Sequence, residues 1–361
     1  MIVKSLELSN FRNYNSLSLQ FSKETNIIYG DNAQGKTNIL EGIYLCATTK
    51  SHKGSKEKEI IRLGEEESHI RLSIEKDGIT HRLDMHLKKN KPKGVAIDGI
   101  PIRKTAELFG IVNVVFFSPE DLSMIKDGPS ERRRFIDMQL CQLDRLYLHN
   151  LINYNKVLNQ RNNLLKQIGF NKSLLDTIYV WNEQLVKYGI EIIKTRANFV
   201  KNINDIVQEI HENLSDGKEN LKVIYEPNTM ASELSSRIEH SIERDVALKV
   251  TNVGPQRDDL SFIVNEKDIR KFGSQGQQRT VALSLKLSEI ELVKSITKDS
   301  PILLLDDVLS ELDRNRQNKL LDSIQNIQVL LTCTGLEEFV IHRMNTEKIY
   351  KVANGFVKEE T

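Results

Sequence analysis

The segment IIYGDNAQGKTNILE, residues 27–41, is the feature that most constrains how this chain folds. An apolar run typical of a strand leads into a loop that contains Gly30 and Gly35, and a helical pattern follows. The glycines let the backbone curl so that successive N–H groups point inward. Lys36 offers a charge to the β and γ phosphates of a nucleotide, and Thr37 offers a hydroxyl to Mg²⁺. An ordinary glycine-rich turn rarely has this strand and helix around it, so we predict a nucleotide-binding loop.

A strand far along the chain supplies acidic partners for such a loop. Residues 301–307, PILLLDD, contain no polar side chain before Asp306, as in a parallel strand that is buried on both faces. Such a strand delivers its terminal carboxylates to the sheet edge where α/β ligands bind. We predict that Asp306 holds the Mg²⁺ shell and that Asp307 accepts a proton from, or orients, the attacking water. The alternative is that both aspartates only cap the next helix.

A second helix start, within FGSQGQQRTVALSLKLSEIEL (residues 272–292), also has the features of a phosphate site. Gly273 and Gly276 free the backbone, and Ser274 can donate a hydroxyl. One nucleotide rarely needs two such helix ends from one subunit. We therefore predict a symmetric homodimer in which this segment of each subunit closes the ATP of the other. The alternative is a simple helix cap.

The rest of the chain divides into β-rich and helical parts. Strands are predicted within residues 2–29, in a hairpin that turns at Asp77-Gly78, beside a second turn at Asp98-Gly99, and over residues 111–119. From about residue 130 the apolar period becomes helical. A break at Gly169 and a capping box from Ser173 to Asp176 separate two helices, which predicts an antiparallel hairpin with arms on the order of 50 Å. The apolar stripe of the second helix, which includes Leu185, Ile192 and Phe199, indicates packing and no chemistry.

Composition limits what the protein can be. With 361 residues, of which 39% are hydrophobic, the chain can form two or three structural units. Its formal charge of +1 means that any contact with nucleic acid must come from local patches. Cys46, Cys141 and Cys333 have no metal-ligand spacing and are expected to be core thiols in a reducing cytoplasm. No apolar run approaches the ~18 residues of a membrane span, so we expect a cytoplasmic protein without a membrane partner.

Taken together, these motifs resemble those of ABC-type ATPase heads of the SMC kind, and more specifically those of the RecF family of bacterial recombinational repair ATPases. The resemblance rests on these segments of the chain: NFRNY (10–14), NAQGKTNILEGIY (32–44), KSHK (50–53), SPEDLSMIKDGPSERRRFID (118–137), GPQRDDL (254–260), GSQGQQRT (273–280) and LLLDDVLSELD (303–313). It implies an α/β fold in which residues 1–125 and 245–361 form the ATPase head. Residues 126–244 would then be an inserted helical lobe.

The resemblance also assigns roles to individual residues. Asp306 and Asp307 match the Walker B pair, with Thr37 and Asp306 as metal ligands and Asp307 and Lys36 as the catalytic residues. Ser310 to Asp313 match the loop that contacts the other subunit of the dimer. The residues expected to bind the cofactors ATP and Mg²⁺ are Arg12, Gly30, Asp31, Asn32, Ala33, Gln34, Gly35, Lys36, Thr37, Ser274, Gln275, Gly276 and Gln277.

The function that the resemblance implies is ATP-dependent work on DNA. The protein would dimerise on ATP, bind double-stranded and gapped DNA, and act with RecR and RecO to help load RecA at single-strand gaps. This places it in DNA replication, recombination, repair and the SOS response to DNA damage. Its ATPase would be weak, DNA-stimulated and used as a timer.

Four positions depart from the patterns of related ATPases. Asp307 stands where a cassette ATPase usually has Glu, which suggests slow hydrolysis because the side chain is one methylene shorter. Thr334 stands at the position where related ATPases have the switch histidine. No Q-loop glutamine is evident, and Glu120 is only a candidate for its role. Gln256 replaces the His of the family pattern GPHRDD.

DNA contact and two other functions remain open from the residues alone. Residues 44–104 carry 14 Lys and Arg against 9 Asp and Glu, with the basic runs KSHKGSKEK (50–58) and KKNKPK (88–93). Solvated faces have such runs too, and Arg132 to Arg134 could form a structural pairing site instead. The alternatives are the ATPase subunit of a transport system and a short-armed chromosome-structuring ATPase. The inserted lobe, the absent Q-loop glutamine and the short hairpin arms argue against them.

Overall fold

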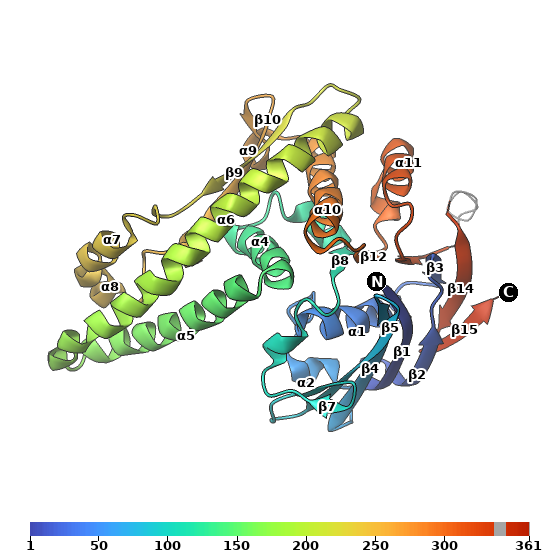
Figure 1. Ribbon diagram of the computed structural model, residues 1–361, viewed down its shortest axis with the longest axis horizontal. Helices are drawn as coiled ribbons and strands as arrows, with labels where there is room; N and C mark the ends of the chain where they lie inside the picture. Colours follow the sequence, from blue (N-terminus) through green and yellow to red (C-terminus); the bar gives the residue numbers. More distant parts are fainter. Residues whose placement is uncertain (336–343, 361) are drawn as a thin grey trace. The chain divides into compact units, whose positions relative to one another are not determined.

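The computed structural model describes residues 1–335 and 344–360, which form two compact units (Figure 1). The first unit comprises Met1–Leu122 and Leu285–Thr361, and the second comprises Ser123–Ser284. Both ends of the chain thus contribute to the first unit. Residues 245–284, which we predicted in the ATPase head, lie in the second unit because their strand β10 (Asp259–Val264) pairs with β9 (Leu221–Glu226). The domain ranges stay a prediction.

A mostly parallel sheet occupies one layer of the first unit. Its strands β14, β3, β13, β12 and β8 run parallel to one another, and β15 joins the edge in antiparallel fashion. The apolar runs predicted around residues 27, 115 and 303 are strands of this sheet. In spatial order the strands are β15 (Phe356–Glu360), β14 (Thr346–Ala353), β3 (Thr25–Tyr29), β13 (Val329–Cys333), β12 (Ile302–Asp306) and β8 (Val114–Phe117).

An antiparallel sheet forms the other layer. The hairpin of β4 and β5 turns at Asp77 and Gly78, which have φ angles of 52° and 75°, as the predicted Asp-Gly turn requires. Asp98 and Gly99 likewise connect β6 to β7. In spatial order the strands are β2 (Tyr14–Gln20), β1 (Ile2–Phe11), β4 (Glu67–Lys76), β5 (Ile79–Lys88), β6 (Gly94–Ile97) and β7 (Ile100–Pro101).

One apolar core joins the two sheets to α1 (Lys36–Thr48). Leu6 and Ile70 of the antiparallel sheet, Ile43 of α1 and Leu304 of the parallel sheet belong to the same buried cluster. This packing fixes the helix that follows the phosphate loop. The other helices of the unit are α2 (Glu57–Ile60), α3 (Pro119–Ser123), α11 (Arg314–Ser323), and the 3₁₀ turns Thr105–Leu108 and Leu309–Glu311. The last residue of α3, Ser123, is the first residue of the second unit.

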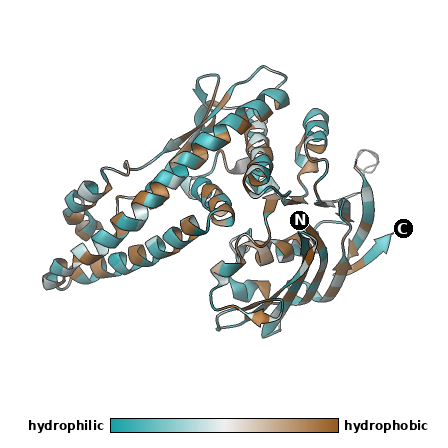
Figure 2. Ribbon diagram, in the orientation of Figure 1, coloured by the Kyte–Doolittle hydropathy of each residue, from teal (hydrophilic) through white to brown (hydrophobic). Residues whose placement is uncertain are grey.

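The second unit is mainly helical, and its central pair is α5 (Arg145–Ile168) with α6 (Ile178–Leu214). Hydrophobic and hydrophilic residues alternate along α6, and Leu185, Ile192 and Phe199 are buried as predicted (Figure 2). The remaining elements are α4 (Pro129–Leu143), α7 (Leu234–His240), α8 (Ile242–Leu248), the 3₁₀ turns Lys172–Thr177 and Pro255–Arg257, β11 (Lys267–Asp268), α9 (Ile269–Phe272) and α10 (Gln275–Thr297), which continues into the first unit.

The connection between α5 and α6 differs from its prediction. The expected capping box from Ser173 to Asp176 is wrong, because residues 172–177 form a 3₁₀ turn in which Asn171 accepts the backbone N–H of Ser173. With 24 and 37 residues, α5 and α6 are about 36 and 55 Å long, so one arm is shorter than expected. Among the described helices, none is long and apolar enough to cross a membrane.

Candidate nucleotide-binding site

The carboxyl ends of four parallel strands bring part of the predicted site, the glycine loop with Asp306 and Asp307, to one edge of the sheet. Strand β3 ends at the glycine loop, and β12 ends at Asp306. Strand β13, which lies between them, brings Thr332 and Cys333 to the same edge. Strand β8 leads to Ser118. Parallel pairing therefore brings together residues that are 269 positions apart, such as Thr37 and Asp306, at the place where α/β folds bind ligands.

The backbone of the loop has the conformation that its glycines allow. Gly30 has a φ of 152°, and a Cβ there would lie 2.2 Å from the carbonyl oxygen of Val352 in β14. Gly35 has a φ of 113°, and Ala33 also has a positive φ, of 63°. In the described parts of the chain, no N–H of residues 31–35 donates to a backbone carbonyl. These N–H groups precede the N-terminus of α1 and can bind an anion.

Contacts from distant segments hold the loop in place. Asn13 Nδ2 donates to Gln34 O at 2.8 Å, and Tyr14 OH donates to Gly35 O at 3.1 Å. The Gln34 side chain accepts the backbone N–H of Asn354 at 2.5 Å. No pattern in the sequence predicts these contacts, and the NFRNY segment, which contains Asn13 and Tyr14, is the one signal that points toward two of the residues.

Lys36 is buried at the start of α1. Its Nζ donates to Gly30 O at 2.5 Å and to Asp31 O at 2.9 Å, so the ammonium lies within the curve of the loop. It makes no ion pair with a carboxylate within residues 1–335 and 344–360. Asp31, Asn32 and Ala33 are exposed. The ammonium charge is therefore held by carbonyl dipoles in a place that suits a phosphate.

The candidate metal ligands Thr37 and Asp306 are in direct contact. Thr37 Oγ1 donates to Asp306 Oδ1 at 2.8 Å, and Thr332 Oγ1 donates to the same oxygen at 2.7 Å. A hydroxyl beside a carboxylate is an oxygen donor set that suits Mg²⁺, which keeps several waters when bound by few protein ligands. The residues present thus fit Mg²⁺. Thr332 was missed by the sequence analysis, although it ends an apolar strand as Asp306 does.

Asp307 follows directly and has an unusual backbone conformation. Its φ is 52°, and its N–H donates to Thr332 O at 3.2 Å and Oγ1 at 3.0 Å. Burial raises the pKa of the Asp307 carboxyl, and the charges of Asp306 and Glu311 raise it further, whereas Lys36 opposes them. A carboxylate with a raised pKa at this edge is suited to accept a proton.

Arg12 has a different environment from the one predicted. Its guanidinium donates to both carboxylate oxygens of Glu41 in α1, at 2.8 and 2.7 Å, and also to Ser55 Oγ and Glu59 O. Ser51 Oγ donates to Glu41 at 2.5 Å. Burial would raise the pKa of Glu41, but its hydrogen bonds with Arg12 and Ser51 lower it overall. Arg12 therefore supports α1 in this structure, and its nucleotide contact stays a prediction.

The second predicted phosphate-binding segment belongs to the second unit. Ser274 and Gln275 are exposed, and the backbone N–H of Gln277 donates to Ser274 Oγ at 3.2 Å. In return, Gln277 Oε1 accepts the N–H of Ser274 at 3.1 Å, which is the reciprocal pattern of a capping box. Gln277 Nε2 also donates to Glu219 at 2.8 Å. Gly276 lies within the first turn of α10.

The remaining motif residues named from the sequence lie in both units of the structure. Glu120 is exposed at the start of α3, and Ser310 Oγ donates to Asp307 O at 2.7 Å. Gln256 accepts the hydroxyl of Tyr154 in the second unit. Arg132 is buried and pairs with Asp259 at 2.6 Å, which is the structural role left open for Arg132 to Arg134.

Known proteins resemble this chain over its full length. The family described as RecF/RecN/SMC N terminal domain matches residues 2–358. A DNA replication and repair protein RecF from Lachnoclostridium phytofermentans is 71% identical, and the match covers 99% of this chain and 100% of the relative. The RecF of Lachnospira eligens is 61% identical, with all of both chains covered.

Solved structures agree with this result. The recombination mediator protein RecF of the RecFOR pathway, solved with ATP, matches with a TM-score of 0.92 and 34% identity over 100% of this chain and 98% of that one. An Smc head bound to the C-winged helix domain of ScpA matches with a TM-score of 0.58 and 17% identity over 100% and 97%, which shows the fold alone. The predicted α/β head of the ABC ATPase type is thus confirmed. The chain belongs to the RecF family of DNA replication and repair proteins.

Proposed function

We propose that this protein binds ATP with Mg²⁺ at the glycine loop and uses the bound state to control its association with DNA. The observation that carries the proposal is the contact of Thr37 with Asp306 beside the buried Lys36 ammonium. Lys36 would exchange its carbonyl partners for the β and γ phosphates, while the loop N–H groups hold the same phosphates. Mg²⁺, held by Thr37 and Asp306, would neutralise charge that develops on the phosphates. ATP is also the ligand of the solved RecF structure that matches this chain.

Hydrolysis in this proposal depends on Asp307. Its raised pKa favours proton acceptance, and its short side chain reaches less far than the Glu of related ATPases. The protein would therefore be a slow ATPase whose turnover sets how long the bound state lasts. We further propose that DNA stimulates this turnover.

The bound state would be a homodimer. Ser274 and Gln275 are exposed at the N-terminus of the long helix α10, so they can reach a nucleotide held by a second copy. The hydroxyl of Ser274 and the amides of Gly276 and Gln277 would bind the γ-phosphate there. Closure of two such sites makes dimerisation depend on ATP.

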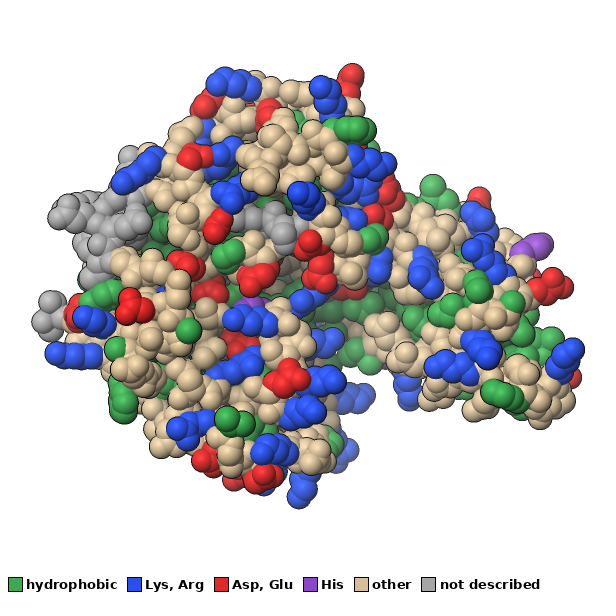
Figure 3. Space-filling view, turned by 180° about the vertical axis from the view of Figure 1, so that it is seen from behind, with side chains coloured by type: hydrophobic (Ala, Val, Ile, Leu, Met, Phe, Trp, Pro, Cys, Tyr) green, Lys and Arg blue, Asp and Glu red, His purple; other side chains and the backbone are tan. Residues whose placement is uncertain are grey.

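Contact with double-stranded and gapped DNA would come from one of the two basic runs. In residues 88–93, Lys88 pairs with Glu67, Lys89 with Glu66, and Lys93 with Glu57. In residues 50–58, by contrast, four lysines are exposed: Lys50, Lys53, Lys56 and Lys58. On the face shown in Figure 3, basic side chains gather at the lower edge of the view, and basic and acidic side chains are interspersed over the rest. The proposal therefore assigns backbone contact to residues 50–58.

The partners proposed for this state are RecR and RecO, which would use the DNA-bound dimer to help load RecA. The relatives are DNA replication and repair proteins, and the matching RecF structure is described as part of the RecFOR pathway. We place this work in the cytoplasm.

The experiment is fluorescence anisotropy of a labelled gapped duplex against the full chain, with and without ATP and Mg²⁺, at two salt concentrations. ATP and a non-hydrolysable analogue should both tighten binding, and binding should weaken with salt because phosphate contacts release counterions. Lys36→Met should abolish the gain. Absence of DNA binding under every nucleotide condition would contradict the proposal.

Three variants test the shared ATP site and the DNA contact separately. Ser274→Arg should bind ATP as a monomer but fail to dimerise, because the long cation blocks closure. If Ser274→Arg still dimerises with ATP, the shared site is wrong even if DNA binding persists. Lys53→Glu with Lys56→Glu should weaken DNA binding, whereas Lys89→Glu in the paired run should change it less.

A further inference from the structure

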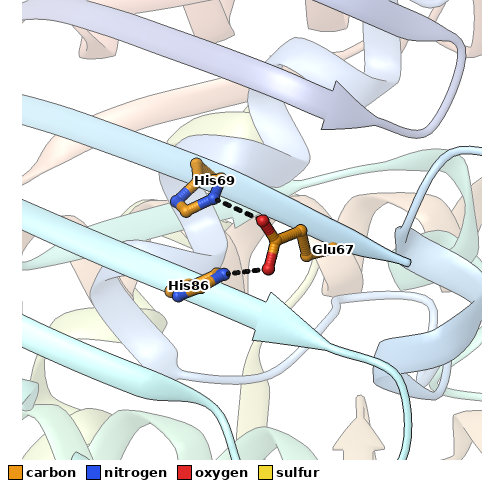
Figure 4. Close-up of side chains that lie close together, drawn as sticks. All are labelled: Glu67, His69 and His86. Carbon is orange, nitrogen blue, oxygen red and sulfur yellow. Dashed lines mark hydrogen bonds and ion pairs between the residues drawn. The ribbon is translucent and has the colours of Figure 1, made fainter. Parts of the chain in front are cut away.

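A cluster of two histidines and a glutamate lies on the outer face of the antiparallel sheet, apart from the nucleotide-binding site (Figure 4). Glu67 and His69 are on β4, two residues apart, so their side chains leave the same face of the strand. His86 on β5 is the direct cross-strand partner of His69. The two imidazole rings stack with centroids 3.9 Å apart. Sheet geometry alone therefore brings the three side chains together.

The potential ligand atoms are close enough to share one ion. One atom from each of the three side chains lies within 4.8 Å of the others. His86 Nε2 is 3.0 Å from Glu67 Oε2, and His69 Nε2 is 3.8 Å from Glu67 Oε1. Ligands at about 2.1 Å from a tetrahedral ion lie roughly 3.4 Å from one another. Small side-chain rotations would thus be enough to reach coordination geometry.

The neighbouring positions leave room for an ion and a further ligand. His69 pairs with Ser9 on its other side, and His86 pairs with Gly94, which has no side chain. Both histidines line a hollow of about 500 Å³ on this face. An ion held by the cluster would have its remaining coordination positions open toward that hollow.

One neighbouring group opposes a cation. Lys88 Nζ lies 3.0 Å from Glu67 Oε2, so the ammonium forms an ion pair with this carboxylate when no metal ion is present. The Lys88 side chain is 41% exposed and can turn into solvent. The ion would replace it as the partner of Glu67.

We propose that Glu67, His69 and His86 form a binding site for a zinc-type divalent ion, with water or an exogenous ligand in the position facing the hollow. Two imidazoles and one carboxylate suit Zn²⁺ and its late first-row neighbours, whereas Mg²⁺ prefers oxygen ligands alone. The site is therefore chemically distinct from Thr37 and Asp306. It does not depend on the proposed function, because no nucleotide or DNA contact is involved.

The test is a Zn²⁺ titration of the metal-free full chain in competition with a chromophoric chelator, without nucleotide and with excess Mg²⁺ to occupy oxygen sites. One equivalent should bind. His69→Gln and His86→Gln should each weaken binding by more than about tenfold, since even the loss of a supporting partner costs that much. Lys88→Met should tighten it, because the competing ammonium is removed.

The matched control is His81→Gln. His81 is also on β5 and also contacts a carboxylate, Asp98, but it is outside the cluster, so zinc affinity should not change. Nitrogen ligation should be visible in the electron paramagnetic resonance spectrum of bound Cu²⁺ and be reduced in His69→Gln. Circular dichroism verifies that each variant is folded. Equal affinity of the unmodified protein and both cluster variants, or no binding tighter than about 100 μM, would overturn the proposal.

Discussion

The nucleotide-binding edge of the first unit and the helical core of the second unit handle buried charge in opposite ways. At the sheet edge, the Lys36 ammonium rests on two carbonyl oxygens, and Asp306 accepts from two hydroxyls. In the helical unit, Arg161 and Arg196 are almost completely buried; Arg161 pairs with one carboxylate and Arg196 with two. The charges of the first region are stabilised by carbonyl and hydroxyl dipoles, whereas those of the second region are neutralised by opposite charges.

Each helical pair belongs to a network of several hydrogen bonds, although Arg161 Nη2 is buried without a partner among the described residues. Arg161 on α5 donates to Asn182, Asp245 and Thr251 at 2.7 to 2.8 Å. Arg196 on α6 contacts Asp137 and Asp258, each at 2.8 Å. Burial raises the pKa of Asp258, although the charge of Arg196 opposes this. Each network links segments that are distant in the chain, so its charges define the packing of the unit.

The difference shows how one chain separates support from binding. A charge already paired with an opposite charge is costly to remove from its partner, so it suits a structural role. A charge held by carbonyl or hydroxyl dipoles can change partners at lower cost, so it suits a ligand. Substitutions at the sheet edge should therefore change ATP binding or hydrolysis, whereas substitutions of the buried pairs should change stability.

Asp307→Asn should lower ATP hydrolysis by about 10²- to 10⁴-fold, which is the usual contribution of a general base, and should leave ATP binding intact. Single-turnover hydrolysis and nucleotide affinity measure the two effects.

The rate of ATP hydrolysis by the unmodified protein should fall as the pH falls through the raised pKa of Asp307, because the protonated carboxyl accepts no proton. Its raised pKa also means that Asp307 adds stability below its ordinary pKa, which is lost as the pH rises through the folded-state value. Full activity of Asp307→Asn would exclude it as the base.

Arg161→Met should destabilise the helical unit by about 3–5 kcal/mol, because Asp245 is left buried without its counter-charge. Urea unfolding followed by circular dichroism measures the free energy. Arg237→Met is the matched control, since its pair with Glu233 is exposed and spans 3.9 Å, and it should cost at most about 1 kcal/mol. Equal effects of the two substitutions would contradict a structural role for the buried pair.

Gly30→Ala should weaken ATP binding by about tenfold or more, because its Cβ would lie 2.2 Å from Val352 O and strain the loop. Isothermal titration calorimetry with ATP and Mg²⁺ measures the affinity. Gly64→Ala is the control, since Gly64 also has a positive φ, of 93°, but has open space at its Cβ. If both variants bind ATP equally well, the close approach to β14 does not shape the site.

Thr332→Val should have the smallest effect. The substitution removes the hydrogen bond that Thr332 Oγ1 donates to Asp306, of 2.7 Å, and the one that it accepts from the N–H of Asp307, of 3.0 Å. The rate of ATP hydrolysis should fall about fivefold, which corresponds to about 1 kcal/mol of lost stabilisation. Steady-state ATPase assays measure the change. A loss as large as that of Asp307→Asn would mean that Thr332 itself takes part in the chemistry, and the division between support and binding would need revision.

Local patterns predicted much of the fold. The glycine loop, the apolar strand before Asp306 and the two Asp-Gly turns each depend on residues that are close in sequence, and the structure contains all of them. The period of the apolar residues also predicted the pair of long helices. These features are set by backbone conformation and by burial of one face, both of which can be read from short segments.

Contacts between distant residues could not be predicted in the same way. Neither the pairing of Arg12 with Glu41 nor that of Arg132 with Asp259 follows from the spacing of either residue. The same is true of the hydrogen bond from Thr332 to Asp306, which depends on the order of strands in the sheet. Motifs on either side of residues 245–284 favour the head, whereas the pairing of β10 with β9 joins these residues to the second unit, and no short segment indicates that pairing.

The contacts that β14 and the turn after it make with the phosphate loop have a consequence for synthesis on the ribosome. Val352 O lies against Gly30, and the Asn354 N–H binds Gln34, 320 residues earlier. The loop is translated among the first residues, yet two of its supports emerge only after more than 300 further residues. A nascent chain would therefore carry an unfinished phosphate loop for most of its translation. A bound nucleotide could then stabilise the completed phosphate loop only after the segment that contains β14 has left the ribosome.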